Sequence, residues 1–153
     1  MNNLELKVPP PVLVISIALA MWVATRWLPA GEISVPLRFG LSGLWFLAGL
    51  AIAVAGVVAF RKANTTIDPR APQKSSSLVE NGIFKHSRNP MYLGMVLVVT
   101  AWAIYLANAV SFAFIPLFVL YMHRFQIVPE ERWMQQKFGD EYQAYAARVR
   151  RWV

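Results

Sequence analysis

The sequence contains no cysteine and few charged residues, and both shortages limit what the protein can be. Without cysteine there are no disulfides and no thiolate metal sites. Charged residues make up 15% of the 153 residues and hydrophobic residues 57%, which is far from the composition of an average soluble domain. The length suits a single domain, residues 1–153, and the composition predicts an integral membrane protein.

The sequence also lacks the motifs of the common soluble enzymes. It has no Walker loop, no glycine-rich dinucleotide fingerprint, no Gly-x-Ser-x-Gly elbow and no His-Glu-x-x-His zinc motif. These absences argue against soluble nucleotide enzymes and hydrolases. The two histidines do not stand at ligand spacing to each other, so no metal site is expected.

The formal net charge is +7, from 15 basic and 8 acidic residues. Such a charge can indicate nucleic-acid binding. Here, however, the basic residues lie between apolar runs and at the C-terminus, as the positive-inside rule requires of membrane proteins. We therefore expect membrane lipid, and no nucleic acid, as the partner.

Four apolar runs are each long enough to cross a hydrocarbon core of ~30 Å at ~1.5 Å per residue. They cover about residues 12–28, 40–60, 90–106 and 110–128. A short uncharged turn joins the last two, which predicts a tight helical hairpin. In the second run, Ala51, Ala55 and Ala59 recur every four residues beside Gly49 and Gly56, a pattern that favours close helix packing.

The stretches outside the apolar runs set the expected topology. Residues 61–85 are polar and basic, which places them in the cytoplasm, and four spans then place both termini there as well. In residues 129–153, apolar residues step by three or four, as in amphipathic helices that lie on the membrane surface or on the bundle, and Gly139 is expected to divide this tail. The predicted fold class is all-α: an integral membrane bundle of about four transmembrane helices with a cytoplasmic amphipathic helical tail. The expected location is a bacterial inner membrane.

The polar segment 81–94 runs directly into the third apolar run and is the first candidate for chemistry. Its polar and helix-starting residues are His86, Arg88, Asn89 and Pro90. Free N–H groups at a helix start favour an anionic group, and Arg88 adds a planar fork that suits a carboxylate. Tyr92 offers a ring and a hydroxyl, and Gly94 permits close approach of a ligand or of another backbone. The alternative is that Arg88 marks topology and Tyr92 is an interfacial aromatic residue.

A second polar group lies around the end of the fourth apolar run. Its members are His123, Arg124, Glu130 and Glu131. Adjacent carboxylates on a helix point about 100° apart, so we expect at most one of the two glutamates to enter a site. The other would favour the N-terminus of the tail helix, where negative charge is stabilising.

Taken in order, three features resemble the superfamily of isoprenylcysteine carboxyl methyltransferases and phospholipid methyltransferases. They are GIF-x-x-SRNPMYLG, a short helical hairpin and EER-x-x-x-x-x-FGDEYQAYAARVRRW, over roughly residues 65–152. The family's usual Arg-His-Pro stands here as Arg88-Asn89-Pro90. The resemblance implies an integral membrane methyltransferase that uses S-adenosylmethionine in a cytoplasm-facing pocket. It also implies a lipophilic small-molecule or prenylated acceptor that enters from the bilayer.

The resemblance implies site residues as well. One wall of the cofactor pocket would be formed by His86, Arg88, Asn89, Pro90, Tyr92 and Gly94. Glu130 and Glu131 would close the pocket from the other side. Arg88, Glu130 and Arg124 would serve catalysis, with Arg124 near the position of a family arginine that stands just ahead of the glutamate pair.

Within such a pocket each group would have a distinct task. Arg88 would hold the cofactor's carboxylate, and one of the two glutamates would hold its ammonium group or ribose. Tyr92 or Trp133 would form an aromatic wall for the adenine. An amine or thiol acceptor would need a base, which His86 or His123 would supply, whereas a carboxylate acceptor would need none.

Other functions remain open at this point. The acceptor can be a prenylcysteine carboxylate, a lipid amine or a small lipophilic thiol or acid. A membrane reductase of the sterol-reductase type would bind NADPH, although it expects a longer set of helices. A third alternative is a non-catalytic membrane interaction protein, and the oligomeric state is not predicted.

Overall fold

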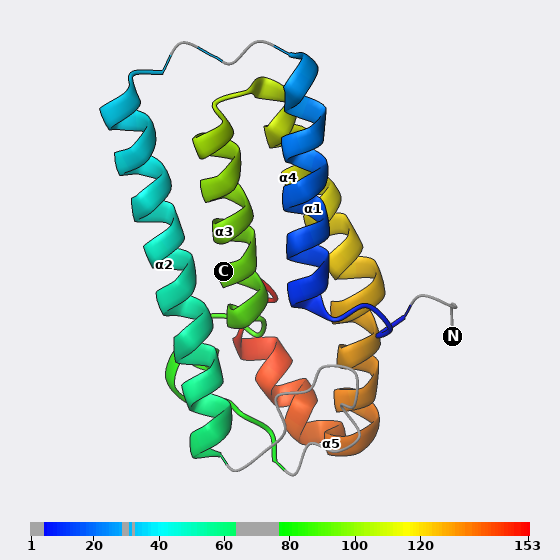
Figure 1. Ribbon diagram of the computed structural model, residues 1–153. Coiled ribbons are helices and arrows are strands. Elements are labelled where there is room, and N and C mark those ends of the chain that lie inside the picture. The colour runs from blue at the N-terminus through cyan, green and yellow to red at the C-terminus, as the bar shows by residue number, and fades with distance from the viewer. Residues whose placement is uncertain (1–4, 29–30, 32, 64–76) are drawn as a thin grey trace.

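The computed structural model describes residues 5–28, 31, 33–63 and 77–153, which form a bundle of helices (Figure 1). The α-helices are α1 Pro10–Ala24, α2 Val35–Lys62, α3 Pro90–Leu106, α4 Ala109–Met122 and α5 Val128–Arg148. Shorter elements are the 3-10 helices η1 Thr25–Trp27 and η3 Gly82–Lys85 and the π-helix η4 His123–Ile127. No strand occurs in the described ranges, and the predicted all-α fold class is confirmed. Residues 64–76, within the polar stretch expected in the cytoplasm, lie outside the described ranges.

Proline stands in the first turn of four helices: α1, α2, α3 and α5. The first N–H groups of a helix have no intrahelical acceptor, so proline loses no hydrogen bond there, and its fixed φ is already helical. For this reason α2 begins at Val35, five residues before the predicted 40–60 span. Because of its prolines, the region before residue 40 was predicted to be a loop. In the structure Pro36 stands in the first turn of α2.

Several helices are long and apolar enough to cross a membrane. Within the described residues, three segments meet that description: Pro10–Trp27, Val35–Lys62 and Ala109–Arg148. The remaining predicted span, α3, is also apolar, and its 17 residues match the predicted 90–106. At ~1.5 Å per residue, its length of roughly 26 Å is at the lower limit for a hydrocarbon core.

Helices α2 and α3 make the closest contact of the bundle, and glycine makes it possible. A Cβ placed on Gly94 would lie 2.5 Å from the carbonyl oxygen of Gly49 and 2.9 Å from the Ala53 side chain. A Cβ on Gly49 would in turn lie 2.6 Å from the carbonyl oxygen of Gly94. The contact stripe on α2 therefore runs through Gly49, Ala53 and Gly56. Gly49 and Gly56 were part of the small-residue pattern in the sequence, and the stripe follows these glycines and not the alanine repeat beside them.

The predicted hairpin between the third and fourth spans is present. α3 ends at Ala107, whose φ of 50° is left-handed, and the chain reverses there. The Asn108 side chain caps α4 by accepting a hydrogen bond of 3.0 Å from the Val110 N–H. This short turn sets α3 and α4 side by side in the bundle (Figure 1).

The sequence predicted that the helix of the fourth span ends just before Pro129. In the structure the helix continues past this proline. Helix α4 continues through η4 into α5 as one helical segment from Ala109 to Arg148. A proline ring clashes with the carbonyl four residues earlier and offers it no N–H, and the wider π turn separates the two groups. The Phe125 carbonyl accepts instead from the backbone N–H of Leu6, at 3.0 Å. The N-terminal segment thus supplies the hydrogen bond that Pro129 cannot.

The tail bends where glycine predicted it. Gly139 has φ 49° and ψ −120° inside α5, and the last turns of this helix fold back under the bundle (Figure 1). The predicted apolar face is buried there: Tyr142, Tyr145 and Val149 form a small core. Leu78, Met134, Phe138 and Ala146 pack against it. The tail therefore rests on the bundle, one of the two placements that its amphipathic pattern allowed.

Candidate functional site

The two polar groups of the sequence meet at one end of the bundle, where the N-terminus of α3 faces the start of α5. A guanidinium nitrogen of Arg88 lies 3.2 Å from a carboxylate oxygen of Glu131, and the two side chains are 15% and 17% exposed. Another nitrogen of Arg88 donates a 3.3 Å hydrogen bond to the Tyr142 hydroxyl. This partly buried pairing joins α3 to both halves of α5.

Arg151 completes the cluster from the C-terminal end of the chain. Its Nε and Nη2 donate to the two carboxylate oxygens of Glu131, at 3.0 and 2.6 Å. Its Nη1 lies 3.5 Å from Nδ1 of His123 on η4. The hydrogen bonds to Glu131 raise the pKa of Arg151 further above its ordinary value, so this guanidinium stays charged throughout the usual pH range. We call Arg88, Glu131 and Arg151 the charged cluster.

Backbone groups of the last residues also hold the start of α3. The carbonyl of Arg150 accepts a 3.0 Å hydrogen bond from the N–H of Arg88. The carbonyl of Arg151 accepts another of 3.0 Å from the amide of Asn89. Trp152 packs on the main apolar core. These contacts hold residues 150–152 against the start of α3, and the side-chain amide of Asn89 provides one of the hydrogen bonds.

The neighbouring glutamate has a separate set of partners. Glu130 accepts hydrogen bonds from the hydroxyl of Tyr92 and, at 2.9 Å, from the amide of Gln126. Tyr92 is 4% exposed, and its ring belongs to the main core. The two carboxylates diverge as helix geometry predicts, but both contact the segment from Arg88 to Tyr92. Of the two glutamates, only Glu131 belongs to the charged cluster, and the expectation that at most one of them enters a ligand site stays a prediction.

The charged cluster retains capacity for an anionic ligand. It contains two guanidinium groups and one carboxylate, so one positive charge is uncompensated within it. The Nε of Arg88 is buried and, among the described residues, has no hydrogen-bond partner. A buried donor without an acceptor is costly, and a ligand oxygen would satisfy it.

Three of the predicted site residues lie elsewhere. Arg124 is about half exposed and lies 3.8 Å from Glu5, away from the charged cluster. His86 is exposed, and Gly94 faces α2, which realises the backbone approach that its small size allows. Pro90 is buried as the first residue of α3. The structure therefore does not bring Arg124, His86 and Gly94 into the charged cluster.

Three residues of the site were missed in the sequence. Arg151 stands in a basic run that the positive-inside rule already explained, and Tyr142 was assigned to an apolar face. Gln126 lies four residues before Glu130, a spacing at which helical side chains meet. That spacing was the one available signal, since the partners of Arg151 and Tyr142 are distant in the chain.

Comparison with known proteins gives a family match that spans most of the helices. A family model described as phospholipid methyltransferase matches residues 37–141, about two thirds of the chain. This chain belongs to the phospholipid methyltransferase family. The match covers α3, the hairpin and both glutamates, and ends before the C-terminal contacts of this family member.

A bacterial protein is also similar to this member of the phospholipid methyltransferase family. An uncharacterized protein of Haemophilus influenzae is 41% identical over 63 residues, which are 41% of this chain and the whole of that protein. No solved structure matches the chain. The family match and the apolar helices together identify a methyltransferase of a membrane superfamily.

Proposed function

We propose that this protein transfers a methyl group from S-adenosylmethionine to a lipophilic acceptor at the membrane surface. The observation that carries the proposal is the charged cluster with its unpartnered Arg88 donor, placed at the end of an apolar bundle. A water-soluble cofactor and an acceptor dissolved in the bilayer can meet only at such a boundary. We infer that this is the cytoplasmic face of a bacterial inner membrane, because basic residues gather there.

The amino-acid end of the cofactor suits the charged cluster. It carries a carboxylate and an ammonium group, so it can replace each partner in the Arg88–Glu131 pair without leaving a buried charge uncompensated. Arg88 would hold the carboxylate, and its unpartnered Nε supplies a further donor. Glu131, held by Arg151, would accept from the ammonium group.

The exposure of each side chain indicates which residue can contact the adenine and which can only position the helices. The ring of Tyr92 is enclosed in the core, so half-buried Trp133 is the better candidate for an adenine wall. Glu130 and Tyr92 position the start of α3 against α5 through their hydrogen bond. When bound, S-adenosylmethionine supplies a methyl group on a sulfonium, which is already activated, so the protein contributes mainly orientation.

The acceptor determines whether a base is needed. Of the two histidines, His123 lies beside the charged cluster and His86 is exposed, so His123 is placed to take a proton from an amine or thiol. A carboxylate acceptor needs no such step. The family match favours a phospholipid amine, and the motifs shared with isoprenylcysteine carboxyl methyltransferases favour a carboxylate.

Calorimetry on the purified protein tests the proposal. We expect S-adenosylmethionine to bind and NADPH not to bind, and we expect Arg88→Ala and Glu131→Ala each to weaken binding at least tenfold. Arg124→Ala, which changes a residue outside the cluster, is the matched control and should bind normally. Binding of NADPH alone would favour a reductase, and binding of neither would favour a non-catalytic membrane protein.

Transfer of a labelled methyl group then identifies the acceptor. The panel comprises prenylcysteines, phospholipids with an amine headgroup and lipophilic thiols. His123→Ala should reduce transfer to an amine or thiol and leave transfer to a carboxylate unchanged. Equal loss with every acceptor would mean that His123 supports the fold and not proton transfer.

A further inference from the structure

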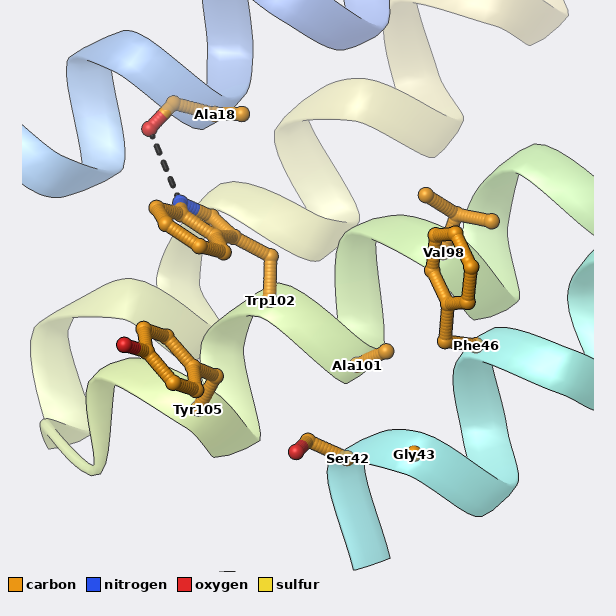
Figure 2. Close-up of a pocket in the computed structure, with 8 residues that line it drawn as sticks. All are labelled: Ala18, Ser42, Gly43, Phe46, Val98, Ala101, Trp102 and Tyr105. Carbon is orange, nitrogen blue, oxygen red and sulfur yellow. Dashed lines mark hydrogen bonds between the residues drawn. The ribbon is translucent and has the colours of Figure 1, made fainter. Parts of the chain in front are cut away.

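A cavity lies toward the opposite end of the bundle from the charged cluster. Its volume is about 400 Å³, within the ~300–1,000 Å³ range of small-molecule sites. It is lined by Ala18 of α1, by Ser42, Gly43 and Phe46 of α2, and by Val98, Ala101, Trp102 and Tyr105 of α3 (Figure 2). Tyr105 follows Pro90 by fifteen residues, so the cavity extends to roughly 22 Å along α3 from the cluster.

The helix arrangement leaves this cavity open to the bilayer. In the described part of the chain, α1 and α2 each pack on α3 but not appreciably on each other (Figure 1). The α3 floor is fixed because the Trp102 indole donates a 3.0 Å hydrogen bond to the Ala18 carbonyl (Figure 2). A Cβ on Gly43 would meet no atom within 4 Å, and Phe46 is 47% exposed. The result is an apolar groove that a hydrocarbon chain can enter from the side.

A cation stands at the end of this groove. Arg38 precedes Ser42 by one helical turn, on the same face of α2. Its guanidinium lies 4.9 Å above the ring of Tyr105, which itself stacks on Trp102. The Nε of Arg38 is buried and has no hydrogen-bond partner among the described residues. The apolar groove suits the acyl chain of a phospholipid. The guanidinium of Arg38, which lies over an aromatic ring and has an unpartnered N–H donor, suits its phosphate.

We propose that this groove binds an anionic phospholipid of the membrane leaflet opposite the charged cluster. A phosphate oxygen would accept from Arg38, and an acyl chain would fill the space beside Gly43. In the described residues no carboxylate contacts Arg38, so nothing there would favour the ammonium of a zwitterionic headgroup. The headgroup lies too far from the charged cluster for this lipid to be the methyl acceptor, and the proposal does not depend on the enzymatic activity.

Native mass spectrometry of the delipidated protein tests the proposal with phosphatidylglycerol and phosphatidylcholine of identical chains. We expect tighter binding of phosphatidylglycerol. Arg38→Gln should weaken that binding about fivefold or more and weaken phosphatidylcholine binding less, because the choline group offsets the charge of its phosphate. Gly43→Leu, which fills the groove, should weaken the binding of both lipids. The matched controls are Arg61→Gln, at the other end of the same helix, and Gly40→Leu, whose added side chain starts from open space outside the lining.

Other outcomes overturn the proposal. If Arg61→Gln weakens phosphatidylglycerol binding as much as Arg38→Gln, the lipid senses only overall charge. If Gly43→Leu changes the oligomeric state while lipid binding persists, the groove receives a second copy of the chain. If Gly43→Leu raises the KM for a methyl acceptor without affecting phosphatidylglycerol, the groove belongs to the acceptor. A photo-reactive residue at position 46 provides a test without side-chain packing changes in the groove floor, and failure to crosslink phosphatidylglycerol there contradicts the proposal.

Discussion

The guanidinium of Arg151 donates hydrogen bonds to both carboxylate oxygens of Glu131, at 3.0 and 2.6 Å. The same carboxylate lies 3.2 Å from Arg88, so the C-terminus and the start of α3 share one anion. A two-point contact fixes the plane of a carboxylate, which a single contact cannot do. Arg151 therefore sets the direction in which Glu131 faces a ligand.

This arrangement predicts that Arg151→Ala weakens S-adenosylmethionine binding about tenfold, or ~1.4 kcal/mol. The reason is loss of orientation at Glu131, and Arg151→Lys should restore only part of the affinity because an ammonium group lacks the planar fork. Arg150→Ala is the control, since Arg150 contacts Arg88 through its backbone carbonyl, which the substitution keeps. Calorimetry measures all three variants, and equal affinities for the two alanine variants would contradict the role of Arg151.

The main features of the fold could be predicted from the sequence, but the partners of the charged side chains could not. Each of the four apolar runs coincides with helix in the described part of the chain, and three lie in segments long and apolar enough to cross a membrane, because length and composition alone decide that property. Pro129 was interpreted as a helix end, since nothing nearby in the chain shows that Leu6 supplies the missing donor to Phe125. Arg151 could not be assigned either, because a basic C-terminus has the same sequence pattern whether it binds a carboxylate or only faces the cytoplasm.

The hydrogen bond between Tyr92 and Glu130 predicts a measurable coupling. Tyr92 is buried and Glu130 is partly buried, and a hydrogen bond to a charged group contributes ~1.5–3 kcal/mol. A double-mutant cycle with Tyr92→Phe and Glu130→Gln should give a coupling energy of about 1–3 kcal/mol in the free energy of unfolding. Chemical denaturation in detergent measures it.

A parallel cycle provides the control for this coupling. Tyr142 bonds to Arg88 and not to Glu130, so Tyr142→Phe and Glu130→Gln should act additively within ~0.5 kcal/mol. Similar coupling energies in both cycles would show that the variants perturb the whole helix junction. The specific Tyr92–Glu130 contact would then not explain the stability of this end of the bundle.

A glycine-to-alanine substitution should have opposite effects on stability at Gly94, which lies at the α2–α3 contact, and at Gly40, which lies outside it. Gly94→Ala places a methyl 2.5 Å from the Gly49 carbonyl oxygen, and overpacking of this kind costs ~1–3 kcal/mol. Gly40→Ala meets open space, and there the better helix propensity of alanine should stabilise the protein by ~0.5–1 kcal/mol. Thermal unfolding compares the two variants. A neutral Gly94→Ala would mean that α2 and α3 separate at little cost.

The N-terminal segment predicts a contribution to stability from a buried carboxylate. Glu5 has a side chain 3% exposed and lies 2.6 Å from Arg132 of α5 and 3.8 Å from Arg124 of the π-helix η4. Both arginines are about half exposed, so solvent screening limits each pair to less than ~1 kcal/mol. We expect Glu5→Gln to lower the free energy of unfolding by about 1 kcal/mol.

A surface pair provides the control for Glu5. Glu80 and Arg148 lie 2.8 Å apart with side chains 27% and 66% exposed, so Glu80→Gln should change stability by less than ~0.5 kcal/mol. Hydrogen exchange adds a local readout, because Leu6 bonds to Phe125 beside Glu5. The amide of Leu6 should lose protection in Glu5→Gln and keep it in Glu80→Gln. Unchanged protection in both variants would show that the backbone contact alone holds the N-terminal segment against the π turn.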